Sequence, residues 1–234
     1  LSKFFSTPLK SHSTSYLSHS DWVIYKAFAL FEDGFELKQK QRFSLSLLKI
    51  SRKDIIAVEV LPAAFITFMS YIAYGTILTL IPDWTQHLGI SNKGLFFIVF
   101  TLSSLLMRFL AGRASDRYGR TRVITAGLFL LVVALFILGF ADTFAGFLAG
   151  SVAYGIATGV LSPALNAWTV DMSHPDHRGK AMATMYIALE AGIGLGALLA
   201  GWFYQDLISR VPVILYGSAS VAFVGLLYML NRLK

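Results

Sequence analysis

Six long apolar runs dominate this sequence and limit what it can fold into. Each is close to the roughly 17 to 25 residues that a helix needs to cross the hydrocarbon core of a bilayer. Inside these runs the only formally charged residues are Arg108 and Glu190. The runs occupy residues 61–82, 94–111, 123–141, 144–170, 181–203 and 211–230. The sequence therefore predicts an all-α membrane protein with six transmembrane helices.

The composition excludes an ordinary soluble domain. Hydrophobic residues make up 56% of the 234 residues, charged residues make up 14%, and the mean hydropathy is +0.63. Soluble globular domains contain about 45–50% apolar residues. A soluble helical bundle would also keep a polar stripe on each surface helix, and these runs have none. We therefore expect a lipid bilayer around most of the chain.

The positive charge of the chain is interpreted as a topology signal. The net charge of +7 arises from lysines and arginines that gather at the ends of the apolar runs, which argues against a nucleic-acid partner. If the N-terminus is inside, fifteen of these cations lie on the cytoplasmic side, whereas only Lys93 and Arg210 lie outside. The sequence thus predicts a multi-pass protein of the plasma (inner) membrane with both termini in the cytoplasm.

The chain before the first run divides into two segments. Residues 1–36 are rich in serine, contain no run long enough to span, and are expected to form an atypical, poorly ordered segment. Residues 37–60 are expected to form a cytoplasmic linker with a short amphipathic helix, in which Ser51 and Asp54 have the spacing of a capping box. Residues 61–234 are the predicted transmembrane domain. Because the chain begins at Leu1, we expect a fragment, a start that is not native, or a processed terminus.

Residues 112–122, between the second and third runs, carry a dense group of charges. Gly112, Asp116, Arg117, Gly119 and Arg120 form the pattern glycine, three residues, aspartate, basic, any residue, glycine, basic. This pattern resembles the signature loop of the major facilitator superfamily, which joins two membrane helices. The resemblance implies a secondary transporter of twelve spans, built from two six-helix halves that move against each other around a central site.

The resemblance also implies roles for the charged loop. In the family, the corresponding aspartate and arginine help to close the cytoplasmic side, so Asp116, Arg117 and Arg120 are expected to act as an inner gate. Gly112 and Gly119 are expected to permit the tight backbone. The alternative is that the arginines serve only as topology anchors.

Three features favour the C-terminal half of such a transporter. A basic linker precedes the first run, the chain stops four residues after the sixth, and residues 175–181 resemble the loop between the tenth and eleventh spans of drug and sugar efflux members. The N-terminal half would then be supplied by a full-length chain or by a second chain.

Glu190 lies about eleven residues, or roughly 16 Å, into a helix whose hydrocarbon path is about 30 Å. A carboxylate at that depth is costly unless it faces a cavity or a partner. Proton coupling is one hypothesis for Glu190. The alternatives are a hydrogen bond to a neighbouring helix, or contact with the substrate in a watery cavity.

Other span residues are candidates for the cavity or for packing. Tyr71, Tyr74, Asn166 and Trp168 are candidate cavity residues, although aromatic residues also occur in interfacial belts and between helices. Gly192 and Gly196 have the four-residue spacing that lets two helices approach closely.

The sequence predicts neither an enzyme nor a cofactor or metal site. It has no nucleophile elbow, phosphate loop or metalloprotease helix, no cysteine, and too few ligands around His174 and His177 for zinc. The function that we expect is proton-coupled efflux of a small molecule such as a drug or sugar. The alternative is a truncated, transport-inactive membrane protein that acts as an interaction partner or is a remnant. A homodimer that rebuilds twelve spans is a third option.

Overall fold

The computed structural model describes residues 56–233. The predicted segment 1–36 lies outside the described residues, as does most of the predicted linker 37–60, including the capping box at Ser51 and Asp54.

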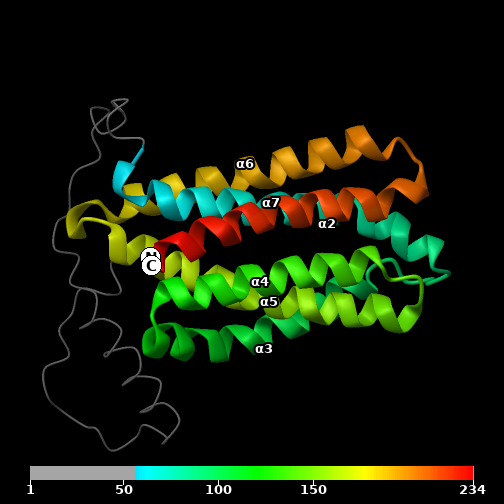
Figure 1. Cartoon of the computed structure of the whole chain (residues 1–234), viewed down its shortest axis with the longest axis horizontal. Coiled ribbons are helices and arrows are strands. Elements are labelled where there is room, and N and C mark those ends of the chain that lie inside the picture. The colour runs from blue at the N-terminus through cyan, green and yellow to red at the C-terminus, as the bar shows by residue number, and fades with distance from the viewer. Residues whose placement is uncertain (1–55, 234) are drawn as a thin grey trace, which may run out of the picture. The chain divides into compact units, whose positions relative to one another are not determined.

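Six long helices make up the described part, joined by short connections (Figure 1). All six are long enough and apolar enough to cross a membrane, which confirms the predicted all-α membrane fold with six spans. They are α2 (Leu61–His87), α3 (Leu95–Tyr118), α4 (Arg120–Gly139), α5 (Phe144–Met172), α6 (Arg178–Tyr204) and α7 (Val211–Arg232). Single turns of 3-10 helix at Val58–Val60, Pro175–His177 and Ile208–Arg210 precede α2, α6 and α7.

The largest difference from the sequence-based boundaries lies at the ends of α2 and α3. Helix α2 continues past Pro82 to His87, because a proline inside a membrane helix removes only a local part of the hydrogen-bond ladder. Helix α3 runs on to Tyr118, through the charged segment that the apolar pattern had excluded. Hydropathy reports where the bilayer ends, and a helix can continue beyond that point into water.

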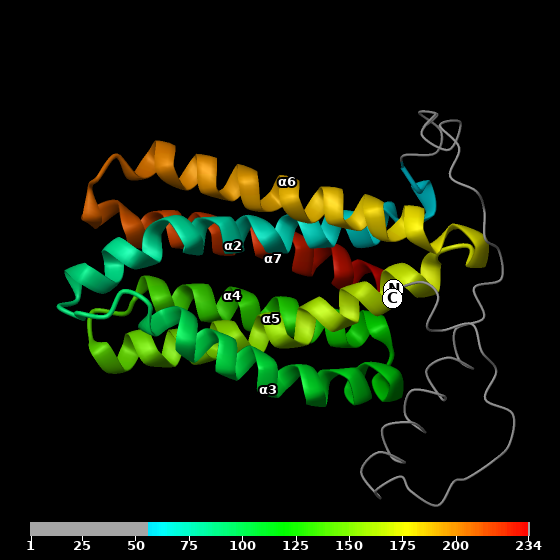
Figure 2. The same cartoon turned by 180° about the vertical axis from the view of Figure 1, so that it is seen from behind.

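The helices form two groups of three. Helices α6, α2 and α7 lie on one side of the bundle and α3, α5 and α4 on the other, as Figures 1 and 2 show. Within the groups the most extensive contacts are α2 with α6 and α5 with α3, and α4 packs against α7 between the groups. The two sets of three helices, α2–α4 and α5–α7, make equivalent contacts: α2 packs on α6 as α5 packs on α3, and α4 packs on α7. Three helices are an odd number of membrane crossings, so the second repeat, α5–α7, begins on the opposite side of the membrane from the first. This is the arrangement of an inverted repeat.

Glycines bring the backbones together in both of the extensive pairs. A Cβ on Gly192 would lie 2.6 Å from the carbonyl oxygen of Phe68, and one on Gly196 would collide with the backbone of Ile72, both in α2. In the other group, a Cβ on Gly155 or Gly159 would lie 2.6 Å from a carbonyl oxygen of α3. Both pairs have the four-residue spacing of close membrane-helix contacts, so the packing role inferred for Gly192 and Gly196 agrees with these contacts.

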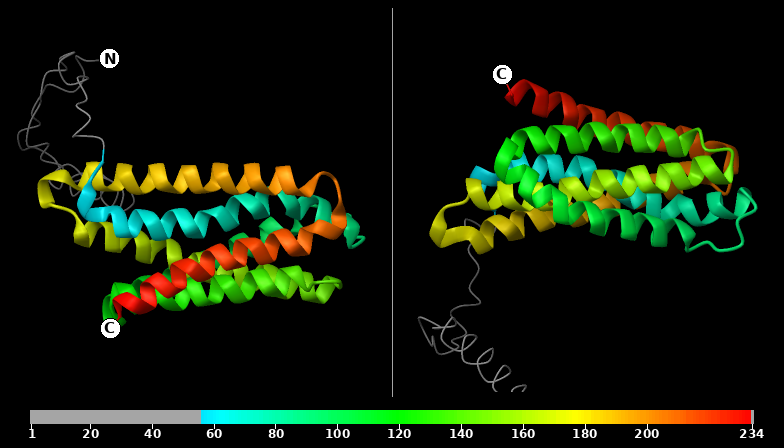
Figure 3. Two further views of the ribbon diagram at one scale, coloured as in Figure 1. Left: turned by 45° about the horizontal axis from the view of Figure 1, so that its top comes forward. Right: turned by 90° about the horizontal axis from the view of Figure 1, so that it is seen from below.

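Basic residues gather at one end of the bundle. Helix α2 begins and α7 ends at this end, as Figure 3 shows. Among the described residues, seven arginines and lysines lie there, against Lys93 and Arg210 at the other end. The seven are Arg113, Arg117, Arg120, Arg122, Arg178, Lys180 and Arg232.

Helices α3 and α6 are the least covered by the rest of the bundle. Only 17% of the most apolar stretch of α3 and 22% of that of α6 are buried, compared with 61% for α2. The two helices lie at opposite edges (Figure 1). Their open faces must therefore meet lipid or another protein surface.

The glycine contact predicts opposite effects for two alanine substitutions in α6. Gly196→Ala should destabilise the bundle by about 1–3 kcal/mol, because its methyl group would overlap the backbone of Ile72. Gly194→Ala should be neutral or slightly stabilising, since a Cβ there meets open space and alanine favours helix. Thermal unfolding of the two variants in detergent micelles measures the difference. Equal melting temperatures would contradict this assignment.

Candidate functional site

A single glycine separates α3 from α4 in the charged segment. Gly119 has φ of +90°, a conformation that residues with a Cβ rarely adopt, so a glycine is needed there. Gly112 lies inside α3, where its backbone is not among those with positive φ. Gly119 therefore forms the turn between the two helices, whereas Gly112 lies within α3, which continues through that residue.

Arg120, the first residue of α4, joins three helices through its guanidinium. Its Nη1 donates to Asp116 Oδ1 at 2.6 Å and to Ser115 Oγ at 3.0 Å, both at the end of α3. Its Nε donates to Asp171 Oδ2 at 2.9 Å, near the end of α5. The ends of α3, α4 and α5 are thus held together on the basic side of the bundle.

The predicted gate residues do not all take part in this cluster. The structure brings Asp116 and Arg120 together, but the guanidinium of Arg117 lies 5.5 Å from the ring centroid of Tyr118 and makes no ion pair among the described residues. Asp171 was not predicted from the sequence. Its position in the sequence could have indicated it. Asp171 comes directly after the fourth apolar run, and the end of that run lies on the same side of the membrane as the charged segment 112–122.

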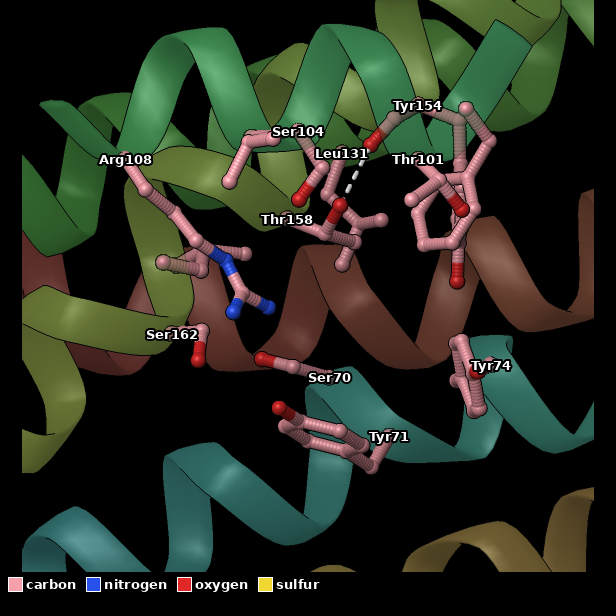
Figure 4. A pocket seen from close by; sticks show the side chains of 13 residues that line it. Ser70, Tyr71, Tyr74, Thr101, Ser104, Arg108, Leu131, Tyr154, Thr158 and Ser162 are labelled. Atoms are coloured by element: carbon pink, nitrogen blue, oxygen red, sulfur yellow. Dashed lines mark hydrogen bonds between the residues drawn. The ribbon is translucent and has the colours of Figure 1, made fainter. Parts of the chain in front are cut away.

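A cavity of about 340 Å³ lies between α2, α3 and α5, near the middle of the spans (Figure 4). Leu131 of α4 closes it on one side. The lining combines aromatic rings, hydroxyl groups and one charge, that of Arg108. The lining residues are Ser70, Tyr71, Tyr74, Phe100, Thr101, Ser104, Leu105, Arg108, Leu131, Tyr154, Thr158, Leu161 and Ser162.

Several hydroxyl groups in the cavity already bond to their own helices. Ser70 Oγ donates to the carbonyl of Ile66 at 2.8 Å, and Thr158 Oγ1 donates to the carbonyl of Tyr154 at 2.9 Å. The hydroxyl of Tyr154 differs, because it is buried and has no hydrogen-bond partner in the described part of the chain. A buried phenol without a partner is costly unless something else enters the cavity to accept its proton.

The four residues predicted to line the cavity lie in three different environments. Tyr71 and Tyr74 line the cavity. Asn166 lines a smaller pocket of about 50 Å³ that also touches Tyr71. Trp168 is only 8% exposed and packs in the hydrophobic core.

Glu190 lies in the middle of α6 and is exposed. It precedes Gly192 by two residues, so its side chain leaves the helix about 200° around from the face that contacts α2. It does not line the cavity. Arg108, in contrast, lines the cavity but was not among the site residues predicted from the sequence, although a lone charge inside an apolar run marks it.

The fold and its charged segment match a known family. A model of the Major Facilitator Superfamily matches residues 63–233, nearly all of the described part. The chain belongs to the major facilitator superfamily. The members of this superfamily are multi-pass membrane transporters and not enzymes, and the chain accordingly has six membrane-length helices, half of a major facilitator fold.

Curated relatives in the superfamily are distant and longer. The chain is 28% identical over 159 residues to "Multidrug resistance protein 2" of Bacillus subtilis, an alignment that covers 63% of this chain and 40% of the relative. It is 24% identical over 173 residues to "Quinolone resistance protein NorA" of Staphylococcus aureus, covering 73% of this chain and 44% of the relative. The chain therefore spans less than half the length of these relatives.

Solved structures of superfamily members show the same fold. The human organic anion transporter MFSD10 (TETRAN) superposes with a TM-score of 0.62 at 20% identity, covering 80% of this chain and 48% of that one. The peptide transporter POT gives a TM-score of 0.60 at 19% identity, covering 74% and 37%. At this level of identity the likeness concerns the fold alone.

The cluster around Arg120 predicts a measurable coupling between α4 and α5. In a double-mutant cycle, Arg120→Gln and Asp171→Asn should show a coupling of about 0.5–1 kcal/mol in unfolding free energy, because partly exposed ion pairs contribute about that much. A matched cycle of Arg117→Gln with Asp171→Asn should show almost none. Coupling of the same size in both cycles would mean that Arg120 does not connect the helices.

Proposed function

We propose that this chain is the C-terminal half of a proton-coupled efflux transporter of the plasma membrane, with a small molecule such as a drug as its cargo. The observation that carries the proposal is the cavity of about 340 Å³ at mid-span, in which polar, aromatic and charged side chains meet. Ligand cavities in proteins have volumes of about 300–1,000 Å³ and combine apolar walls with a few polar groups. The names of the relatives speak of resistance to drugs, which export of drugs from the cell would explain.

The open faces of α3 and α6 support the proposal of a second half. Arg108 on α3 and Glu190 on α6 are charged, exposed and near the middle of their spans. Charged side chains near the bilayer centre almost always face a bundle interior or a water-filled cavity rather than lipid. A second six-helix half packed on α3 and α6, from the same or another chain, would provide that interior.

The second candidate function, a transport-inactive interaction partner, is favoured by the same open faces. The transporter and the interaction partner can be distinguished by sequencing and expressing the complete reading frame that contains residues 1–234. If it encodes six further spans and the product exports cargo, the transporter proposal stands. If the complete product has six spans and moves nothing, the interaction role stands.

We propose that the basic end of the bundle faces the cytoplasm, since short cytoplasmic loops are enriched in lysine and arginine. The chain has no cysteine, so single cysteines can report the side on which they lie. In sealed right-side-out cells, a membrane-impermeant maleimide should label Lys93→Cys but leave Tyr118→Cys unlabelled until the cells are lysed. Labelling of Tyr118→Cys in intact cells would reverse the orientation.

Glu190 is the proposed proton carrier, because it is the only carboxylate among the described residues that lies deep within a span. In everted vesicles containing the complete product, we test an anionic, a neutral and a cationic aromatic probe and keep the one that the parent transports. Glu190→Gln should abolish the dependence of that transport on the proton gradient. Asp206→Asn, at an exposed connection between α6 and α7, should leave that dependence unchanged. Gradient-dependent export by Glu190→Gln at the parental rate would exclude Glu190 as the coupling group.

A further inference from the structure

We propose that the cavity between α2, α3 and α5 binds an organic anion, with Arg108 holding its carboxylate and aromatic side chains holding a flat apolar body. This inference rests on the proposed function, because it names the class of cargo for the same cavity. It narrows that class from drugs or sugars in general to aromatic acids.

The charge of Arg108 has no counter-ion in the described part of the chain. Arg108 makes no ion pair or hydrogen bond with residues 56–233, and no aspartate or glutamate lines the cavity. A guanidinium cannot lose its proton in a protein, so it cannot become neutral to avoid the cost of a mid-span position. An anion entering the cavity would supply the missing counter-ion.

The surroundings of Arg108 suit a carboxylate. In Figure 4 the guanidinium extends from α3 into the cavity toward Ser70 and Tyr71 of α2 and Ser162 of α5. A guanidinium binds a carboxylate through two parallel hydrogen bonds. The proton of Ser70 is already donated to the carbonyl of Ile66. The hydroxyls of Tyr71 and Ser162 hydrogen-bond to each other, so this pair has one proton left to donate at this end.

Aromatic rings line the other end of the cavity. The ring centroid of Phe100 lies 6.2 Å from that of Tyr74 and 5.6 Å from that of Tyr154. Such rings bind flat aromatic groups through stacked or edge-to-face contacts. The buried hydroxyl of Tyr154, which has no partner, gives this end a donor for an oxygen on the body of the ligand.

The same features disfavour other cargo. A cation would be repelled by Arg108, and a neutral sugar would leave the guanidinium without a counter-ion. The competing explanation is a carboxylate from a second half that pairs with Arg108 permanently. In that case Arg108 would be structural and would not select cargo by charge.

Three probes of nearly equal shape and different charge test the proposal. Radiolabelled naphthylacetate, naphthylacetamide and naphthylethylamine are anionic, neutral and cationic at neutral pH. Scintillation proximity with the complete product in lipid nanodiscs gives their affinities. We expect naphthylacetate to bind at least about tenfold more tightly than the amide, with the amine weakest, because charge-assisted hydrogen bonds are about twice as strong as neutral ones.

Substitutions at Arg108 test whether this side chain causes the preference for the anionic probe. Arg108→Gln should weaken naphthylacetate binding by about tenfold to a hundredfold and leave the amide unchanged. Arg108→Glu should reverse the order, so that the amine binds best, which a misfolded variant could not show. Arg113→Gln, five residues further along α3 and outside the cavity, is the matched control and should behave like the parent.

Equal affinity for all three probes, no binding of any probe, or an anion preference that survives Arg108→Gln would each overturn the proposal. These outcomes are distinct from failure of the proposed function. A protein that transports the neutral or the cationic probe but shows no anion preference remains a transporter with different cargo. A protein that binds naphthylacetate through Arg108 but exports nothing retains the anion site and loses the transport role.

Discussion

The six-helix bundle depends on direct contact between helix backbones at glycine. In lipid, apolar side chains gain little by leaving one hydrocarbon surface for another, so helices associate through close packing and polar contacts. Gly192 and Gly196 provide such packing against α2, and Gly155 and Gly159 provide it against α3. Each pair uses one face of its helix and fixes where the neighbouring helix crosses. The crossing of α5 on α3 sets how the cavity-lining residues of these two helices face each other, whereas the contact of α4 with α7 places α2 opposite them.

This packing also explains why α3 and α6 remain open. They are the outer members of their groups, and each contacts mainly one partner, α5 or α2. Under the inverted repeat, α3 and α6 occupy equivalent positions, and each carries one mid-span charge, Arg108 or Glu190. Because the two helices lie at opposite edges, these charges cannot neutralise each other within the described bundle.

The fold was largely predictable from the sequence, because the bilayer requires long apolar runs and their starts lie within three residues of the observed helices. The charged segment was harder to predict, since hydropathy marks the membrane boundary and not the helix end. Its main ion-pair partner, Asp171, required knowledge of which helix ends are neighbours. For the cavity, Trp168 and Tyr71 likewise show what the sequence does not reveal. Both are aromatic residues in spans, and only helix rotation decides that one lies in the core and the other lines the cavity.

The placement of the two mid-span charges implies that the proposed cargo and the proposed proton do not share a binding site. Arg108 lines the cavity, whereas α6 contributes no residue to it and Glu190 faces away from α2. Coupling between them must then be conformational. A second half packed tightly on the open face of α6 would desolvate Glu190, and a neutral carboxyl group costs far less there than a charged one. Protonation of Glu190 would thus favour the state in which that contact is closed. Because a ligand or proton can shift an equilibrium only by its difference in affinity between the two states, this contact is where the proposed proton gradient would act.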